Sequence, residues 1–238
     1  MTKRLRVFGG PNGSGKTTLI EAIKNKFSLG IYINPDDIEK DIKSKGGYFD
    51  FTEFNINLNK DKFKRYIKSN TFYNVSLNDV NFNQNSIQLK EINSYIASLL
   101  SGFIREELLH RNKSFSFETV MSSKDKVEFL KRAKEIGFKT YLYFIATDDP
   151  EINISRVKTR VEKGGHSVPE EKIKSRYYKS LDNLSEAIKY TNRAFLFDNS
   201  LEKRIFICEI ENAKRVDLKT NEFPSWFDKY FLKKTKKV

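Results

Sequence analysis

The sequence predicts an α/β fold in which helices cover both faces of a mainly parallel sheet. Segments with strand character alternate with segments of helical periodicity along most of the 238 residues. A glycine-rich loop at 9–15 joins the first strand directly to the first helix. Residues 139–145 are almost continuously apolar or aromatic, which is typical of a strand buried on both faces. The length fits one domain, residues 1–238, with room for an insertion.

The first part of the chain predicts two strands and two helices. The strands are expected at 4–8 and 31–33, and apolar residues at helical spacing predict the first helix at 16–27. Asn34 and Pro35 have the residue types of an N-cap and a first helical position, so a second helix is expected to begin there.

An insertion is expected at about 45–95. Residues 45–85 are polar and rich in Asn, with scattered Phe and Tyr, and they predict irregular structure. Apolar residues then recur three and four positions apart, which predicts one long amphipathic helix at about 87–111 that covers one face of the sheet.

The second half of the chain continues the alternation. Strands are expected at 114–118, 139–145 and 194–197, and a helix at 124–136. Two further helices at about 150–180 predict a lid, and Ser167 with Glu170 has the pattern of a capping box for the second of them. Alternating residues on both sides of an Asn-Ala pair at 204–217 predict an added antiparallel hairpin.

Composition excludes several classes of protein. The single Cys208 leaves no partner for an internal disulfide and is expected to be an apolar strand residue, and two His residues are too few for a histidine-rich metal site. No apolar stretch approaches the roughly 20 residues that a membrane helix needs, so no membrane association is expected, and the cytoplasm is the expected location. The formal net charge of +13 favours anionic partners.

The loop at 10–17 reads Gly-Pro-Asn-Gly-Ser-Gly-Lys-Thr and matches the phosphate-binding loop motif at each fixed position. In this motif backbone N–H groups surround the phosphates, the Lys reaches the β and γ phosphates, and the next hydroxyl ligates Mg²⁺. Lys16 is therefore the candidate catalytic cation and Thr17 the candidate metal ligand, with ATP and Mg²⁺ as expected cofactors. The residues expected to bind ATP are Gly10, Pro11, Asn12, Gly13, Ser14, Gly15, Lys16, Thr17 and Thr18.

Several blocks together resemble the zeta-toxin family of P-loop kinases. They are GGPNGSGKTT at 9–18, NPDDI at 34–38, FETV at 117–120, RVKTRVEKGGHSVPEEKIKSRYYKSLDNL at 156–184 and DNS at 198–200. The resemblance implies a P-loop fold of the nucleoside-kinase type. It also implies an ATP-dependent kinase whose acceptor is the sugar of UDP-N-acetylglucosamine or a related nucleotide-sugar, and an antitoxin protein as a partner.

Three residues are candidates for binding the acceptor. Asp36 takes the place of the family's Asp that activates the acceptor hydroxyl, and a carboxylate is suited to accepting that proton. Glu118 and Thr119 end a predicted strand, where open α/β sheets place ligand-binding groups, and the resemblance makes Glu118 an acceptor-site residue. The alternatives are structural, since a helix dipole favours Asp36 in a first turn and Glu118 is suited to capping the next helix.

Basic residues concentrate in the predicted lid. Residues 151–179 carry eight Lys or Arg against four Glu. Like charges four positions apart on a helix repel one another unless an anion lies between them, which indicates a lid that faces phosphates. Arg160 and Arg176 are the candidate catalytic arginines, with Arg156 as a substitute. A solvated basic helix face is the alternative, but a Gly pair at 164–165 favours the lid because it permits a hinge.

Two late segments complete the pattern. Residues 198–200, Asp-Asn-Ser, follow the last core strand where related kinases have a loop near the adenine, and a plain turn explains them equally well. Residues 223–227 are apolar and are expected to pack against the domain as a clasp.

Three classes of function are compatible with these observations. An ATP-dependent kinase that acts on an anionic small molecule is favoured. A nucleic-acid-acting P-loop kinase agrees with the net charge and the abundant aromatics, but the chain has no extended basic-aromatic stripe. A non-catalytic ATP-binding regulatory module is disfavoured by the intact set of Asp36, Glu118 and lid arginines.

Overall fold

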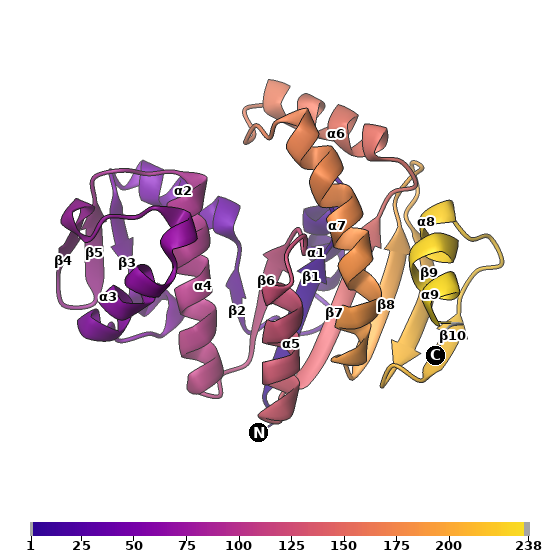
Figure 1. Cartoon of the computed structure of the whole chain (residues 1–238), viewed down its shortest axis with the longest axis horizontal. Coiled ribbons are helices and arrows are strands. Elements are labelled where there is room, and N and C mark those ends of the chain that lie inside the picture. Colours follow the sequence, from indigo (N-terminus) through magenta and orange to yellow (C-terminus); the bar gives the residue numbers. More distant parts are fainter. Residues whose placement is uncertain (1, 236–238) are drawn as a thin grey trace. The chain divides into compact units, whose positions relative to one another are not determined.

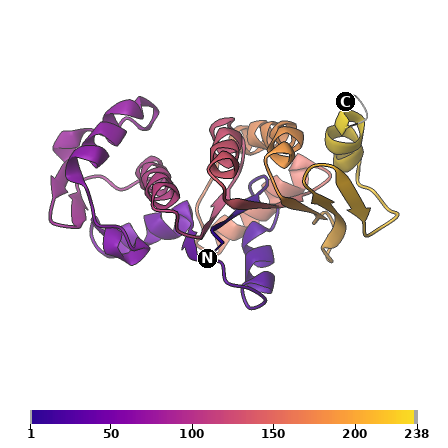
Figure 2. The same cartoon turned by 90° about the horizontal axis from the view of Figure 1, so that it is seen from below.

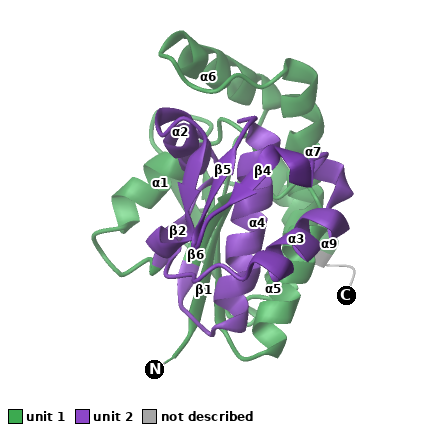
Figure 3. Cartoon of the chain, turned by 90° about the vertical axis from the view of Figure 1, so that its left-hand side faces the viewer, with its two compact units in different colours: residues 1–30, 116–238 green, residues 31–115 purple. Residues whose placement is uncertain are grey.

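The structure, a computed structural model, describes residues 2–235. The chain forms two compact units, and each is described separately below (Figure 3). Unit 1 consists of Met1–Gly30 and Ser116–Val238, and unit 2 of Ile31–Phe115. Among the described residues, no helix combines the length and the apolar character needed to cross a membrane.

The sheet of unit 1 is mainly parallel, as predicted. Its strands lie in the order β10-β9-β8-β7-β1-β6. Their bounds are β1 (Arg4–Gly9), β6 (Phe115–Thr119), β7 (Lys139–Ala146), β8 (Arg193–Asp198), β9 (Ile205–Glu211) and β10 (Arg215–Leu218). The central pairs β1–β7 and β7–β8 are parallel, whereas β8–β9 and β9–β10 are antiparallel. The parallel centre places the ends of β1, β7 and β8 at one edge of the sheet.

Helices cover both faces of this sheet. They are α1 (Lys16–Ile23), α5 (Asp125–Glu135), α6 (Pro150–Glu162), α7 (Glu170–Lys189), α8 (Ser225–Phe227), a π-helical turn (Asp228–Leu232) and α9 (Lys233–Thr235). In Figures 1 and 2, α5 and α7 lie on one face and α1 on the other. Val7, Leu142 and Leu196 are fully buried, so the core lies along the central strands.

The predicted C-terminal hairpin is confirmed. β9 and β10 pair antiparallel, and two of the three residues of the connecting turn, Asn212 and Ala213, have positive φ angles of 49° and 56°. Cys208 lies fully buried in β9, where burial raises the pKa of its thiol to about 12. Cys208 is therefore an apolar strand residue, as expected from the sequence.

Unit 2 is more regular than the sequence indicated. Its elements are β2 (Ile31–Ile33), α2 (Pro35–Ser44), β3 (Tyr48–Asp50), a 3₁₀ turn (Phe51–Phe54), α3 (Lys60–Ser69), two more 3₁₀ turns (Thr71–Tyr73 and Leu77–Asp79), β4 (Val80–Phe82), β5 (Ser86–Leu89) and α4 (Ser94–His110). The strands form an antiparallel sheet in the order β3-β5-β4. The prediction of irregular structure at 45–85 is therefore wrong.

The many Asn residues of unit 2 explain this error. Asn59 and Asn93 cap α3 and α4, with side chains that accept hydrogen bonds from the first-turn amides. Asn55 and Asn74 have positive φ angles at the ends of 3₁₀ turns. Asn therefore marks the ends of short elements here, because its side chain bonds the nearby backbone and tolerates the left-handed conformation.

Three predicted helix boundaries need correction. The helix expected at 87–111 begins at Ser94, because Asn93 caps it and the residues before it form β5. The helix expected at 16–27 ends at Ile23. The capping box of Ser167 and Glu170 does not form, because Pro169 occupies the N-cap and Glu170 is then the first helical residue, too early to reach back to the cap.

Candidate functional site

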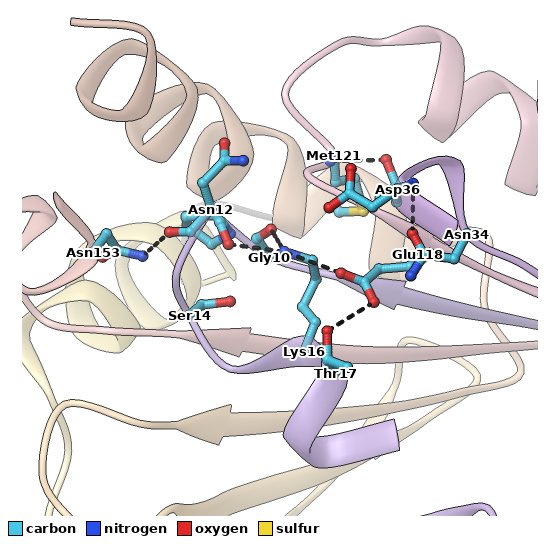
Figure 4. A network of polar contacts seen from close by, with 12 residues as sticks. Gly10, Asn12, Ser14, Lys16, Thr17, Asn34, Asp36, Glu118, Met121 and Asn153 are labelled. Carbon is cyan, nitrogen blue, oxygen red and sulfur yellow. Dashed lines mark hydrogen bonds and ion pairs between the residues drawn. The ribbon is translucent and has the colours of Figure 1, made fainter. Parts of the chain in front are cut away.

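The phosphate-loop motif lies where β1 ends and α1 begins (Figure 4). Gly15 is the N-cap of α1, with φ of 97° and no side chain to cap the helix. The first N–H groups of α1 therefore have no side-chain partner at the cap, and the positive end of the helix dipole lies at the loop. This is the local arrangement that binds anions in phosphate loops.

Contacts with the protein itself explain the three glycines of the loop. Gly10, Gly13 and Gly15 all have positive φ angles. A Cβ atom on Gly10 would stand 2.0 Å from the Ile145 carbonyl oxygen, and one on Gly13 would stand 2.6 Å from the Asn153 carbonyl oxygen. The sequence predicted these glycines from the wrapping of backbone around phosphate. The structure adds that the loop packs too closely against β7 and α6 for any side chain there.

The Lys16 ammonium bends back over the loop. It is 7% exposed and donates hydrogen bonds of 2.9 Å to the carbonyl oxygens of both Gly10 and Pro11. The Glu118 carboxylate lies 3.8 Å from it. These contacts keep one positive charge at the mouth of the loop, although the ammonium is largely buried.

Thr17 and Glu118 bring two oxygen ligands together beside this cation. The Thr17 hydroxyl donates a 3.5 Å hydrogen bond to Glu118, which stands near the end of β6 (Figure 4). Glu118 does not cap the following helix, because the N-cap of α5 is Lys124 and makes no side-chain cap bond. A hydroxyl and a carboxylate are hard ligands that suit Mg²⁺. Within residues 2–235 no group of three or more His, Cys, Asp or Glu residues could hold a metal ion.

Two further loop residues present buried polar atoms. Asn12 Oδ1 and Ser14 Oγ are both buried and have no hydrogen-bond partner among the residues that the structure describes. The Ser14 hydroxyl is a donor that fits a phosphate oxygen. Pro11 is buried and Thr18 is exposed on the first turn of α1.

Thr119 takes part in a local turn. Its hydroxyl oxygen accepts a 3.0 Å hydrogen bond from the amide of Met121, which has a positive φ of 57°. A non-glycine residue in the left-handed region carries strain, and this bond stabilises it. The role of Thr119 in acceptor binding stays a prediction.

The two predicted lid helices are present and share a small core of their own. Ile154 and Val157 of α6 pack with Ile173 of α7 and with the partly buried Val168. The turn between the helices contains Gly164, with φ of 85°, and nothing lies within 4 Å of a Cβ built on it. This turn therefore needs a left-handed residue, and Gly supplies it without strain.

The three candidate arginines have different surroundings. Arg156 donates a 2.6 Å hydrogen bond to the Asn199 carbonyl oxygen, and Arg160 donates one of 2.9 Å to the His166 carbonyl oxygen. Arg176 is half-buried on α7 and makes no hydrogen bond or ion pair with another described residue. A depression of about 400 Å³ is lined by Arg156, Thr159, Arg160, Lys163, Gly164 and Gly165.

Asp36 lies in unit 2, in the first turn of α2. The Asn34 side chain accepts a 3.0 Å hydrogen bond from the Asp36 amide, and Pro35 is the first helical residue, so the predicted helix start is confirmed. For the neighbouring Asp37, desolvation raises the pKa of the carboxyl group, the Asn34 hydrogen bond lowers it and the Asp36 charge raises it again.

Two asparagines that hold the loop were not predicted as site residues. Asn153 is fully buried in α6, and its amide donates a 2.5 Å hydrogen bond to the Asn12 carbonyl oxygen. Asn199 donates one of 2.8 Å to the Ser14 carbonyl oxygen. The position of Asn199 after a core strand was a signal in the sequence, whereas Asn153 lies inside a helix with no such signal.

A family model described as an AAA domain matches residues 2–226. An uncharacterized protein of Haemophilus influenzae (strain ATCC 51907 / DSM 11121 / KW20 / Rd) is 32% identical over 96 residues, which are 39% of this chain and 69% of that protein. The family match extends over nearly the whole chain, whereas this relative covers a smaller part of it.

Solved structures share the fold at low sequence identity. The crystal structure of AvrRxo1-ORF1:AvrRxo1-ORF2 with sulphate ions superposes with a TM-score of 0.61 at 14% identity, and the alignment covers 96% of this chain. The chain spans 63% of the length of that protein chain. The PezAT chromosomal toxin-antitoxin system of Streptococcus pneumoniae has a TM-score of 0.51 at 14% identity, over 97% of this chain and 79% of that one.

Proposed function

Because the chain belongs to the family described as an AAA domain, we propose that it is an ATP-dependent phosphotransferase acting on a hydroxyl group of a small anionic molecule. The observation that carries the proposal is the grouping of the Lys16 ammonium, the Thr17 hydroxyl and the Glu118 carboxylate at the start of α1. Phosphoryl transfer needs mostly positioning and charge compensation, and these three groups supply both.

The loop residues bind the triphosphate in this proposal. Backbone N–H groups at the start of α1 and the Ser14 hydroxyl donate to phosphate oxygens, and Lys16 compensates their charge. Thr17 and Glu118 are the residues that would hold Mg²⁺. When bound, Mg·ATP supplies the phosphoryl group and the metal neutralises part of its charge.

Arg176 and Arg160 would stabilise the charge that develops during transfer. We favour Arg176 of the two, because its guanidinium makes no hydrogen bond or ion pair with a described residue and so can pair with phosphate. The Arg160 guanidinium donates a hydrogen bond to the His166 carbonyl oxygen. Arg156 bonds the Asn199 carbonyl oxygen, so we assign it to holding the base of α6 in place of the substitute role considered above. Guanidinium groups suit this task because they pair with two phosphate oxygens at once.

Asp36 would accept the proton of the acceptor hydroxyl. Its support comes from sequence context, since it lies three positions after the end of β2, in the Asn-Pro-Asp-Asp-Ile block. The best acceptor is the sugar of UDP-N-acetylglucosamine or a related nucleotide-sugar, for which the blocks that resemble zeta toxins are the support. An antitoxin partner belongs to the same proposal, supported by the fold likeness to the PezAT toxin-antitoxin system. A cytoplasmic location also belongs to it, and its support is the single cysteine of the sequence.

The test is ³¹P NMR of the purified chain with Mg·ATP and a panel of UDP-sugars, nucleosides, NAD and a short oligonucleotide. We expect a new phosphomonoester on a nucleotide-sugar, and we expect Asp36→Asn to abolish it. The matched control is Asp61→Asn, since Asp61 is also an exposed Asp in a helix first turn, that of α3. This control is expected to keep full activity.

Three other outcomes separate the alternatives. Phosphorylation of the oligonucleotide, with binding that weakens steeply as salt rises, would replace the small-molecule acceptor by nucleic acid. Nucleotide binding without transfer to any acceptor would favour a regulatory module. Full transfer by Asp36→Asn would show that another group accepts the proton.

A further inference from the structure

Asn199 lies at a junction of three parts of unit 1: the phosphate loop, the lid helix α6 and the C-terminal segment. The sequence left the Asp-Asn-Ser segment at 198–200 as either a plain turn or a loop near the nucleotide. The contacts of Asp198, Asn199 and Ser200 decide what this segment does, and they extend the nucleotide site proposed above.

The Asn199 side chain contacts the phosphate loop at a backbone carbonyl group of the loop. Its amide donates a 2.8 Å hydrogen bond to the Ser14 carbonyl oxygen. The contact is tight, because a Cβ atom on Gly15 would stand 2.4 Å from the same Asn199 nitrogen. When the carbonyl of Ser14 is fixed, the peptide plane that it shares with Gly15 is fixed as well, and so is the direction of the Gly15 N–H.

The backbone of Asn199 is held from two sides. Its N–H donates 2.8 Å to the Ala146 carbonyl oxygen at the end of β7, and its carbonyl oxygen accepts the 2.6 Å hydrogen bond from Arg156. The residue therefore links the loop to the strand end and to the second turn of α6. An Asn in a free surface turn would not have these buried partners.

The residue before it is fixed by the C-terminal segment. Asp198 is 4% exposed, and its carboxylate accepts hydrogen bonds from the Trp226 indole N–H at 2.9 Å and from the Ser200 hydroxyl at 2.8 Å. Trp226 is itself 2% exposed and its amide donates to Asp148, at 3.1 Å. A buried carboxylate with several donors is costly to disturb, so this contact fixes the position of its neighbour Asn199.

We propose that Asn199 is a positioning residue for the nucleotide: it orients the phosphate loop through the Ser14 carbonyl and is held in place by the buried contact between Asp198 and Trp226. Two consequences follow. Nucleotide affinity depends on a donor at position 199, and the C-terminal segment is coupled to the phosphate loop although it is distant in sequence. This inference rests on the proposed function, because it concerns the same nucleotide site.

The first experiment measures binding of Mg·ADP to the full chain by calorimetry and by tryptophan fluorescence. Trp226 is the chain's only tryptophan, so tryptophan emission reports on the surroundings of this one residue, which include the contact with Asp198. We expect the emission of the wild-type chain to change on saturation with Mg·ADP, with the same dissociation constant as calorimetry.

The key variant is Asn199→Asp, which has nearly the same shape but places an acceptor against the Ser14 carbonyl. We expect its Kd for Mg·ADP to rise at least about tenfold. The melting temperature without ligand is expected to fall by about 2–12 °C, because the buried Ser14 carbonyl loses its donor and faces a carboxylate, so binding is measured at a temperature where both chains are folded. The matched control is Asn70→Asp, because the Asn70 amide also donates 2.8 Å to a backbone carbonyl, that of Tyr66 in unit 2. This control is expected to bind Mg·ADP as the wild-type chain does.

The pH dependence separates positioning from a merely structural role. A protonated carboxyl group regains an O–H donor, so the affinity gap between Asn199→Asp and wild type is expected to narrow as the pH falls from about 8 to about 5. The same narrowing is not expected from a variant that only destabilises the fold. If Asn199→Asp does not fold, Asn199→Ala removes the donor without adding charge, with the same expected loss of affinity.

A second variant tests the link to the C-terminal segment. Trp226→Phe keeps an aromatic ring but removes the indole N–H, and calorimetry is expected to give a Kd raised about threefold. Wild-type affinity in both Asn199→Asp and Trp226→Phe would overturn the inference while the proposed function stood. A wild-type chain that binds no Mg·ADP would instead overturn the proposed function itself, and the inference with it.

Discussion

At the scale of single residues, Glu118 has the most informative position in the site. The sequence offered it as a residue for the acceptor or as a helix cap, and the structure places its carboxylate beside Thr17 and Lys16. A carboxylate that bonds the Thr17 hydroxyl orients that hydroxyl, and it adds negative charge at the site proposed above for a divalent cation. Its chemistry therefore suits the metal as well as the acceptor.

We predict that Glu118→Gln weakens the response of nucleotide binding to Mg²⁺. Loss of a metal-supporting carboxylate typically costs about 10–100-fold in metal affinity, so the Mg²⁺ concentration that gives half-maximal ATP binding is expected to rise by that factor. ATP binding in the presence of EDTA is expected to stay the same or improve, because one negative charge is lost. Calorimetric titration at several Mg²⁺ concentrations measures both.

The control for this prediction is Glu135→Gln, which changes an exposed carboxylate at the end of α5. It is expected to leave both quantities unchanged. Equal Mg²⁺ dependence in Glu118→Gln and the wild-type chain would show that Glu118 has no part in holding the metal.

At the scale of elements, contacts with three neighbouring elements fix the conformation of the phosphate loop, in addition to the glycines of the loop itself. The end of β7, the first turns of α6 and the turn after β8 all contact it through Ile145, Asn153 and Asn199. These elements meet at the carboxyl edge of the parallel strands, where α/β sheets bind ligands. Helix α6 is thereby anchored at its N-terminal end, next to the loop.

We predict that Gly13→Ala lowers the free energy of unfolding more than Gly46→Ala does. Both glycines have a positive φ, but only at Gly13 would the added Cβ atom meet another residue. Gly46 supplies the comparison, since its φ is 60° and nothing lies within 4 Å of an added Cβ. Gly46→Ala is expected to cost about 1–2 kcal/mol from the left-handed backbone alone. For Gly13→Ala the clash with the Asn153 carbonyl oxygen adds to the backbone strain of its φ of 73°.

Urea denaturation measures the free energy of unfolding for both variants, and ADP titration measures the site. Gly13→Ala is expected to lose ADP affinity as well as stability, and Gly46→Ala stability only. Equal losses of stability in the two variants would mean that the loop can move away from α6 at no cost.

At the scale of the whole molecule, the C-terminal segment packs against the rest of unit 1 and contributes buried aromatic residues to its core. Trp226 and Phe227 are almost fully buried, and the Ser185 hydroxyl of α7 donates a 2.6 Å hydrogen bond to the Tyr230 carbonyl oxygen. Lys234 forms an ion pair of 3.0 Å with Asp182 of α7. The prediction of a clasp at 223–227 is therefore confirmed for Trp226 and Phe227, whereas Phe223 is 39% exposed.

We predict that Phe227→Ala destabilises the chain by about 3–5 kcal/mol, the usual cost of deleting a fully buried aromatic ring. The ring is 0% exposed and lies 5.0 Å from that of Phe231. Phe72→Ala is the control, because Phe72 is 80% exposed and its loss is expected to change stability by no more than about 0.5 kcal/mol. Thermal and urea unfolding compare the two, and similar effects would show that the clasp is not part of the core.

The elements with strong local signals could be predicted from the amino-acid sequence. The phosphate loop, the helix start at Asn34 and Pro35, and the hairpin at 204–217 each depend on residue types whose conformational preferences act over a few positions. Parallel strands buried on both faces are likewise recognisable, because their apolar runs are continuous. These features could be read without any knowledge of distant contacts.

The residues that contact the loop from distant parts of the sequence could be identified only from the folded chain. Asn153, Asn199 and Glu118 lie more than a hundred positions from the motif in sequence, and their contacts with it arise only when β6, β7 and β8 align in one sheet. The short strands of unit 2 were likewise found only in the structure. They are too short, and too often interrupted by Asn caps and turns, to give a periodic pattern in the sequence. Local conformational propensity depends on residues a few positions apart, whereas strand pairing and burial depend on residues from the whole fold. Strand pairing and burial therefore set the geometry of the site.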